Sequence, residues 1–312
     1  MGRYIIHRVI SMVLTIFFIV TITFFLMHAI PGGPFTREKP LPEAIIKALN
    51  EKYKLDDPVW KQYLDYWKDL FRGDLGPSFQ LKHRSVNELI SLGFPITARL
   101  GLVSIIFTLL LGVPMGIISA LRQGKWEDYT TMFLATLGVT IPSFVLATVL
   151  IYLFGVVWKV FPVMSSKLTR PIEYVMPVVA LSGYSLSFIA RLVRSSMLDV
   201  IKQDYIRTAR AKGLSELKVI YKHALKNAVI PVVTYLGPLA AGLLTGSFVI
   251  EKLFSIPGMG GYFVNSVSNR DYTMIMGSTI FYSVLLVVMN FIVDIVYVLV
   301  DPRIKLVTVK EG

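Results

Sequence analysis

Long apolar runs alternate with shorter polar segments along this chain, and the apolar runs have the length of membrane spans. A helix needs about 20 mostly apolar residues to cross the hydrocarbon core of a bilayer. Runs of that length are predicted at residues 9–30, 100–121, 131–157, 175–193, 231–250 and 275–300. The sequence therefore predicts an all-α integral membrane protein with six transmembrane helices.

The composition supports a membrane protein over a soluble one. Hydrophobic residues make up 54% of the 312 residues and charged residues only 17%, with a mean hydropathy of +0.63. A soluble domain carries about 25% charged residues. The net charge of +12 would suit nucleic acid, but the basic residues lie in loops between apolar runs, so no nucleic-acid partner is expected. The absence of Cys excludes disulfides, thiolate nucleophiles and Cys-ligated zinc.

The basic residues indicate which ends of the spans face the cytoplasm. Arg3 and Arg8 precede the first predicted span, Arg122 lies between the second and third, and Arg303 follows the sixth. Residues 194–226, between the fourth and fifth spans, are also rich in Lys and Arg. With six spans, all of these segments lie on one side, and short basic loops are typical of the cytoplasmic side. Both termini are therefore expected in the cytoplasm.

On the opposite side, residues 36–98 are expected to form a small helical element. Residues 42–55 have a helical pattern, and Asp57-Pro58 is typical of the start of another helix. Residues 73–76, GDLG, end this second helix in a turn. Two interpretations stay open: a platform for an extracellular partner, or a lid that covers the bundle. The apolar residues of the second helix recur at Trp60, Tyr63, Leu64, Trp67, Leu70 and Phe71.

A second segment on this side, residues 251–272, combines a proline and three glycines with apolar residues. They are Pro257, Gly258, Gly260 and Gly261. This pattern favours a short helix that dips back toward the membrane, where protein or water must cover its backbone. The segment is a second candidate surface for an extracellular partner.

The polar loop at residues 200–229 has a pattern that predicts docking on a cytoplasmic partner. Gly213 separates two helical patterns, and Lys218, Lys222 and Lys226 lie on one face of the second. Another face carries one apolar stripe of an α-helix. The stripe consists of Leu217, Ile220, Tyr221, Ala224, Leu225 and Ala228. The alternative is an ordinary basic loop that follows the positive-inside rule.

The sequence contains no pattern typical of catalysis. The phosphate-binding motif G-x-x-x-x-G-K-[ST] and the zinc motif H-E-x-x-H are both absent, so the chain is not expected to bind ATP, hold a metal or act as an enzyme. Asp294 is the one acid inside a predicted span, and a structural hydrogen bond to a neighbouring helix is favoured over a role in a substrate path. Arg191 and Arg194 are interpreted as anchors that extend to water from the inner end of the fourth span.

Two other functional classes fit these patterns less well. A channel or secondary transporter that works alone would need charged or broken-helix sites near the middle of the membrane, and only Asp294 comes close. A membrane enzyme would need a nucleophile–base pair or a metal cluster, and the sequence contains neither pattern.

Several short motifs together resemble one family of membrane proteins. They are residues 4–8 (YIIHR), 30–34 (IPGGP), 73–76 (GDLG), 204–214 (DYIRTARAKGL), 256–260 (IPGMG) and 301–303 (DPR). Over essentially its whole length the chain resembles the permease subunit of a bacterial dipeptide/oligopeptide ABC importer, of the peptide permease B type. The general docking motif of such importers is Glu-Ala-Ala, three residues, then Gly. Ala209 and Gly213 match it, whereas Arg207 and Thr208 replace the acid and the first alanine, as suits the peptide/nickel branch.

The resemblance implies an assembly and a location. It implies the type I ABC importer permease fold, with one transmembrane domain over residues 1–312, in the bacterial inner membrane. The expected partners besides lipid are a second related permease, two cytoplasmic ATPases and an extracellular peptide-binding protein. ATP and Mg²⁺ would bind the ATPases, and this chain would bind no cofactor. The implied solute is a peptide, with nickel, glutathione, sugar or another small solute as the alternative, and the residues of the translocation path are not assigned.

The resemblance also implies roles for particular residues. Residues that couple the chain to the ATPases would be Arg207, Thr208, Ala209, Gly213, Leu214, Leu217, Ile220 and Tyr221. Residues that dock the binding protein would be Lys61, Trp67, Lys68 and Gly258. Closure of the ATPases would push the coupling helix and switch the bundle from an inward-facing to an outward-facing state.

Overall fold

The computed structural model describes residues 2–31, 33–35, 42–81, 83–165 and 168–300. Every regular element in these ranges is a helix, apart from one antiparallel bridge between Pro77 and Ser85. The all-α prediction is therefore confirmed. The DPR motif at 301–303 lies outside the described residues, as does Arg303, which contributed to the predicted orientation.

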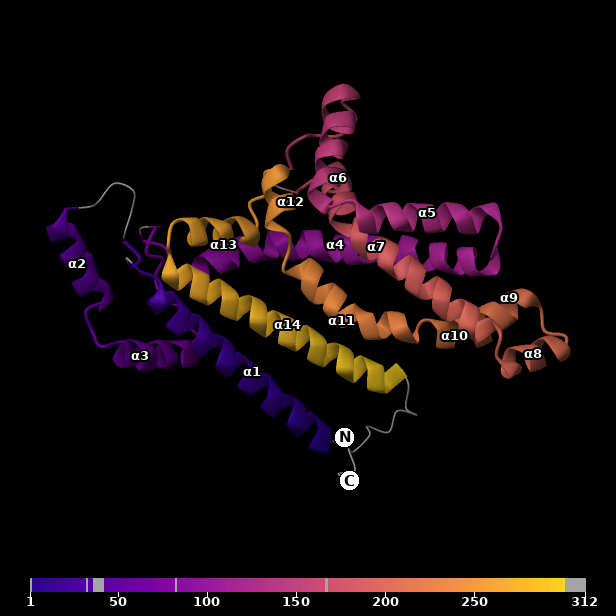
Figure 1. The fold of residues 1–312 in the computed structure, drawn as a ribbon, viewed down its shortest axis with the longest axis horizontal. Helices are drawn as coiled ribbons and strands as arrows, with labels where there is room; N and C mark the ends of the chain where they lie inside the picture. Colours follow the sequence, from indigo (N-terminus) through magenta and orange to yellow (C-terminus); the bar gives the residue numbers. More distant parts are fainter. Residues whose placement is uncertain (1, 32, 36–41, 82, 166–167, 301–312) are drawn as a thin grey trace. The chain divides into compact units, whose positions relative to one another are not determined.

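Five helical segments of the described part are long and apolar enough to cross a membrane (Figure 1). They correspond to five of the six predicted spans. They are α1, Gly2–Ala29; α4, Val86–Leu121; α7, Pro171–Ile201; α11, Ile230–Leu244, with its continuation α12, Phe248–Leu253; and α14, Tyr272–Val300. A sixth span exists if α5, Trp126–Thr140, is counted together with α6, Ser143–Leu150, and the π-helical segment η1, Ile151–Val157.

The third predicted span is not one straight helix. The helices on either side of Ile141 and Pro142 are bent by 105° relative to each other. A proline disfavours the α conformation of the residue before it, and Ile141 accordingly has extended backbone angles, φ −82° and ψ 119°. Pro142 then immediately precedes α6. The bend therefore follows from the local sequence.

The second span begins earlier than predicted, at Val86 and not at residue 100. The Ser85 hydroxyl accepts a hydrogen bond from the backbone N–H of Glu88 at 3.1 Å, which caps the first turn. Ser85 and Glu88 have the Ser-x-x-Glu spacing of a capping box. The first turn also buries Val86 and Leu89. The helix is stable there because it is capped and packed, although its first turns are too polar to be identified as part of a span.

The chain forms two compact units, and α4 and α14 contribute to both. Unit 1 consists of Met1–Ile96 and Pro257–Val287, and unit 2 of Thr97–Ile256 and Val288–Gly312.

Unit 1 contains the helices that were predicted before residue 76. They are α2, Glu43–Tyr53, and α3, Val59–Phe71, and each follows a proline. Val20 and Phe24 of α1 pack with Met276 and Ile280 of α14, and one side of α3 covers this cluster. The short helix predicted after Pro257 is α13, Met259–Ser268. Its first residue, Met259, packs on the first turns of α4.

Asp271 fixes a loop of unit 1 to the start of α14. Its buried carboxylate accepts hydrogen bonds from the backbone N–H groups of Met274, at 3.2 Å, and Phe79, at 3.1 Å. It also accepts a short hydrogen bond from the Ser78 hydroxyl. One carboxylate thus caps a helix and satisfies the backbone of a loop almost 200 residues away in sequence. This role could have been suspected from an Asp immediately before a helical apolar run.

Small residues allow the helices of unit 2 to approach closely. A Cβ atom on Gly116 of α4 would lie 2.6 Å from the carbonyl oxygen of Ala190 on α7. A Cβ atom on Gly138 of α5 would lie 2.1 Å from the Ser187 hydroxyl, also on α7. Close backbone contact at small residues is the usual way in which helices pack within membranes. α7 is therefore the helix around which α4 and α5 are arranged.

Candidate functional site

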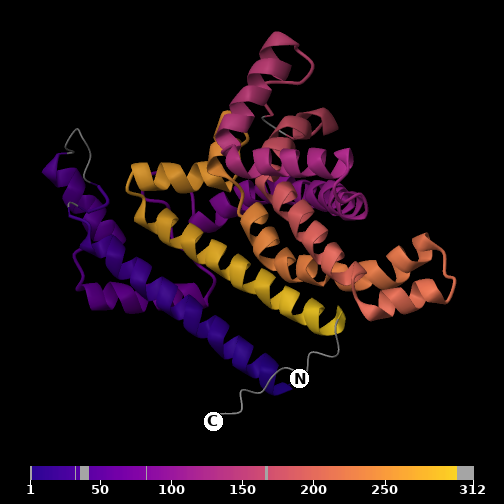
Figure 2. The same ribbon diagram turned by 45° about the vertical axis from the view of Figure 1, so that its right-hand side comes forward.

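The loop predicted to dock on a partner forms two short helical arms at the end of α7. The first arm is α8, Asp204–Ala211. The second is a continuous helical stretch made of α9, Glu216–Lys218; the π-helical segment η2, Val219–Ala224; and α10, Leu225–Ala228. Figures 1 and 2 show α8 and α9 beyond the last turns of α7, joined by a tight connection.

Gly213 makes the connection between the arms possible. Its φ of +75° is in the left-handed region, which strains any residue that has a Cβ atom. Its backbone N–H donates to the carbonyl oxygen of Arg210 at 2.9 Å. Gly213 lies between α8 and α9, so the prediction that it separates two helical segments is confirmed.

An ion pair closes the same turn. Arg210 Nη2 and Glu216 Oε1 are 2.5 Å apart, and a second hydrogen bond joins Nε to Oε2 at 3.1 Å. The hydrogen bond from Arg210 lowers the pKa of Glu216, and the carboxylate raises the pKa of Arg210. Because the folded-state pKa of Glu216 is lowered, the pair stabilises the turn at neutral pH and its contribution is lost as the pH falls through that pKa. Both side chains are exposed, so the contribution is below about 1 kcal/mol.

The predicted apolar stripe of the second arm is divided between the interior and the surface. Ile220, Ala224 and Ala228 are at most 7% exposed, whereas Leu217 is 69% and Tyr221 67% exposed. Only part of the predicted stripe is therefore exposed for contact with a partner. The stripe is wider than the surface that can pack on α7. In addition, the π-helical turns of η2 are wider than those of an α-helix, so side chains along the arm point in different directions from those that an α-helical period predicts. Its middle packs inward and its edge remains on the surface.

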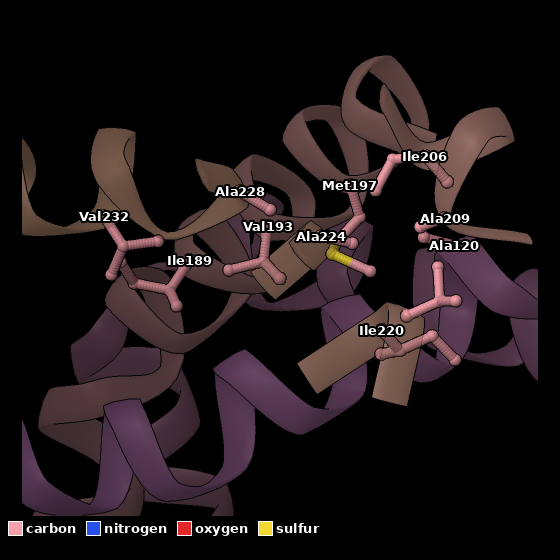
Figure 3. Close-up of a cluster of buried hydrophobic side chains, with 11 residues drawn as sticks. Ala120, Ile189, Val193, Met197, Ile206, Ala209, Ile220, Ala224, Ala228 and Val232 are labelled. Atoms are coloured by element: carbon pink, nitrogen blue, oxygen red, sulfur yellow. The ribbon is translucent and has the colours of Figure 1, made fainter. Parts of the chain in front are cut away.

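The buried side chains of the arms join a core cluster of unit 2. Ile206 and Ala209 of α8 and Ile220 of η2 pack with Val193 and Met197 of α7 (Figure 3). This cluster fixes both arms to the end of a membrane helix. A force on the arms is therefore transmitted to α7 through packed side chains.

The eight predicted coupling residues accordingly fall into two groups. Ala209 and Ile220 are buried, and Leu214 packs against the cluster, so these residues hold the arms in place and do not offer a surface to a partner. The exposed group is Arg207, Thr208, Gly213, Leu217 and Tyr221. Leu217 and Tyr221 are four residues apart and lie one above the other on the helix. They form an apolar pair that is free to contact another protein.

A buried ion pair next to this cluster was not predicted. Arg194 Nε is 2.7 Å from Asp128 Oδ1, and its Nη2 is 2.8 Å from Oδ2. The Asp128 carboxylate also accepts hydrogen bonds from the Ser119 hydroxyl and from the Gly124 N–H. The Asp128 side chain is only 6% exposed, and that of Arg194 25%. The interpretation of Arg194 as an anchor that extends to water is wrong, because the Asp128 carboxylate binds two of the three nitrogens of its guanidinium.

This ion pair connects three helices at one level of unit 2. Ser119 is near the end of α4, Asp128 is in the first turn of α5, and Arg194 is on α7. Ala120 and Val193, beside these residues in sequence, belong to the core cluster that holds the arms. The available sequence pattern was a pair of acids, Glu127 and Asp128, that follows the basic residues Arg122 and Lys125 and lies in the first turn of a helix.

Two of the four residues predicted to dock a binding protein are not free to do so. Trp67 of α3 stacks on Phe17 of α1, with 5.6 Å between ring centroids. Gly258 is buried just before α13. Lys68 is exposed, and Lys61 is exposed but forms an ion pair with Asp57 at 3.0 Å. Aromatic residues in an amphipathic helix first cover the protein's own core, which explains the position of Trp67.

The described residues do not form a metal centre. Nowhere in those ranges do three His, Asp or Glu side chains come together in a group that could hold a metal ion. The candidate site is the exposed part of the two arms, which carries Leu217 and Tyr221.

Comparison with known proteins assigns the family. Residues 112–306 match the profile described as "binding-protein-dependent transport system inner membrane component", and residues 1–101 match its N-terminal counterpart. The chain belongs to this family. It is thus an inner-membrane component that crosses the membrane several times.

Relatives of known name extend over the whole chain. The chain is 52% identical to "dipeptide transport system permease protein DppB" of Bacillus subtilis (strain 168), over 98% of this chain and 99% of the relative. It is 42% identical to "oligopeptide transport system permease protein OppB" of Haemophilus influenzae and of Escherichia coli (strain K12), over 98% of this chain and all of each relative. The resemblance to dipeptide/oligopeptide ABC permeases is confirmed.

A solved structure supports the fold. The chain resembles an inward-facing conformation of the MetNI methionine ABC transporter, with a TM-score of 0.53 and 18% sequence identity. The match covers 68% of this chain and 96% of the other. The type I ABC importer permease fold is confirmed.

Replacing Gly213 with alanine is expected to strain the turn between the arms by about 1 kcal/mol and to lower ATP-dependent transport. The measure is solute transported per ATP hydrolysed by the reconstituted complex. Gly73 has the same φ of +75° and equally open surroundings, so Gly73→Ala is a matched control for backbone strain. Equal effects of the two substitutions would show that the Gly213 turn has no special part in coupling.

Proposed function

We propose that this chain is a transmembrane permease subunit that moves peptides into the cell by alternating access, with energy from ATP hydrolysed by separate subunits. The proposal rests on its similarity, over 98% of its length, to permeases named for dipeptide and oligopeptide transport. The same similarity is the reason for proposing that the transported solute is a peptide. Import of nickel, glutathione or another small solute by the same class of permease is the second candidate.

The proposed assembly has the chain as one of two related permeases. Two cytoplasmic ATPases would bind ATP and Mg²⁺, and an extracellular binding protein would deliver the peptide. Both termini of this chain would then be cytoplasmic, as the positive-inside rule indicates. The pathway between the two permeases would be shared, with half of its lining from this chain.

Docking of an ATPase is proposed at the exposed face of the two arms. Leu217 and Tyr221 supply an apolar pair of the kind that enters a groove on a partner, a helix-in-groove mode of recognition. Arg207 and Thr208 extend this surface on α8. Closure of the ATPases would push the arms, and the buried cluster with Val193 and Met197 would pass the displacement to α7.

Docking of the binding protein is proposed on the side of the membrane opposite the arms. The exposed residues of the expected docking set are Lys61 and Lys68. Reversing both charges should weaken docking to an acidic surface and reduce its salt sensitivity, since exposed charges act mainly on the rate of association.

The chain reconstituted alone in proteoliposomes is expected to hydrolyse no ATP and to accumulate no labelled dipeptide. With the second permease, the ATPases and the binding protein added, ATP should drive uptake. The control is the same complex with an ATPase subunit that cannot hydrolyse ATP. Uptake by the chain alone would instead establish a secondary transporter, and ATP-driven uptake of nickel or glutathione but not of dipeptide would establish the second candidate.

A further inference from the structure

Helix α3 lies alongside α1 and not beyond its end. Gln62 Oε1 is 3.1 Å from Nε2 of His28, one residue before α1 ends at Ala29. Further along α3, the ring of Trp67 stacks on that of Phe17, with 5.6 Å between centroids. The contacts thus move toward the middle of α1 as α3 proceeds, and Figures 1 and 2 both show the two helices side by side.

The level of these contacts places α3 beside the apolar part of α1. Phe17 precedes Ala29 by 29 − 17 = 12 residues, which corresponds to about 18 Å along the helix axis. The apolar span of α1 is Ile5–Ala29, with a mean hydropathy of 2.7. The hydrocarbon core of a bilayer is about 30 Å thick. Trp67 therefore lies beside the segment of α1 that crosses the membrane.

Only part of the apolar face of α3 is covered by α1 and α14. Tyr63, Tyr66, Trp67 and Leu70 pack on the cluster of unit 1. Next to them, a second apolar stripe made of Trp60, Leu64 and Phe71 is 65%, 57% and 84% exposed. At about 100° per residue these three side chains fall within an arc of about 40°. Asp69 lies on the far side of the helix from these three side chains, and Lys68 lies just beyond their edge, about 40° from Leu64.

The exposed stripe continues the apolar surface of α1. Phe18, Ile22 and Phe25 of α1 are about half exposed, which suits a helix face in contact with lipid. The ring of Phe25 stacks on Tyr63 of α3, with 5.4 Å between centroids. The apolar surfaces of α1 and α3 thus meet at this contact. Two Trp and two Tyr are among the 13 residues of α3, and both residue types are enriched at membrane interfaces.

We propose that α3 is an interfacial helix bound by lipid, with Trp60, Leu64 and Phe71 in contact with acyl chains of the leaflet beside the end of α1. Amphipathic helices at membrane interfaces bury their apolar faces against acyl chains in this way. Lipid contact on this side anchors α3 in the leaflet and leaves Lys61 and Lys68, which lie beyond the edge of the stripe around the helix, to the binding protein.

The absence of cysteine makes this proposal directly testable. Leu64→Cys and Phe71→Cys, each spin-labelled, are placed in the complete transport complex in vesicles of phosphatidylcholine and phosphatidylglycerol. Accessibility to oxygen, which concentrates in lipid, is compared with accessibility to a water-soluble nickel chelate. Both labels should have an oxygen-to-nickel ratio several-fold above that of Asp69→Cys on the polar side of α3. Ile22→Cys on α1 is the lipid reference, and Lys47→Cys on α2 is the water reference.

Two outcomes would overturn the proposal. In one, the labels at 64 and 71 match the water reference. In the other, they are accessible to nickel in the complex alone and become protected only when the binding protein is added, which would assign the stripe to that protein. A second measurement avoids reliance on labelled variants: lipid brominated on its acyl chains should quench the fluorescence of the unlabelled complex more than that of a Trp60→Phe complex. Equal quenching in the two complexes would also contradict lipid contact.

Discussion

Replacing Leu217 with aspartate is expected to abolish ATP-driven peptide uptake while the chain remains folded in the membrane. Leu217 is 69% exposed and lies outside the core cluster, and surface substitutions of this kind usually change stability by less than about 0.5 kcal/mol. In an apolar groove of an ATPase, however, the new charge would be buried without a partner, at a cost of about 3 kcal/mol or more. That corresponds to more than about 100-fold weaker binding. The measurements are copurification of the ATPases with this chain and peptide uptake by the reconstituted complex.

Three variants make the result specific. Tyr221→Asp should act in the same way, because Tyr221 lies on the same face one turn further along. Lys218→Ala, which removes one solvated charge, should change binding by about 1 kcal/mol or less. Ile220→Asp places its charge in the core and should lower the amount of folded chain instead. Normal copurification and uptake with Leu217→Asp would show that the ATPase binds elsewhere on the chain.

Properties set by neighbouring residues were predictable from the sequence. The long apolar runs gave the membrane helices, because the length of an apolar run is itself the physical requirement for crossing lipid. The left-handed backbone at Gly213 and the helices that follow Pro42 and Pro58 depend on one or two residues each. The bend at Pro142 and the cap at Ser85 have equally local causes and could have been predicted from the residue before the proline and from the capping-box spacing.

Properties set by distant contacts were not predictable. The stripe that includes Leu217 and Ile220 has a helical period, but the period does not tell which edge of a stripe the chain itself covers. α7 decides that, through Val193 and Met197. Trp67 was likewise placed on a predicted helix and expected to dock a binding protein, but it packs on Phe17, and that contact depends on the path of α1. In both cases the sequence identified an amphipathic helix correctly, but contacts with other helices determine which of its side chains remain exposed to a partner.

Replacing Asp128 with asparagine is expected to lower the stability of unit 2 by about 3 kcal/mol and to reduce uptake strongly. The substitution preserves the shape of the side chain but leaves the Arg194 guanidinium, only 25% exposed, without its counter-charge. It also loosens the junction of α4, α5 and α7 beside the cluster that holds the arms. The effect should be visible as a lower midpoint of thermal unfolding for the purified complex and as less peptide transported per ATP hydrolysed.

A double variant without either charge distinguishes two causes of lost stability: a buried cation without a partner, and the loss of the ion pair itself. Asp128→Asn combined with Arg194→Gln should recover much of the lost stability, because a buried ion pair and a neutral replacement of similar volume often differ little, whereas a single remaining charge is costly. Ser119→Ala removes one hydrogen bond to the same carboxylate and should cost only about 1 kcal/mol. If the double variant regains stability but not transport, the pair does more than neutralise a charge: it sets the position of α7 from which the arms act. A double variant as unstable as Asp128→Asn would contradict the ion pair as the cause of the loss.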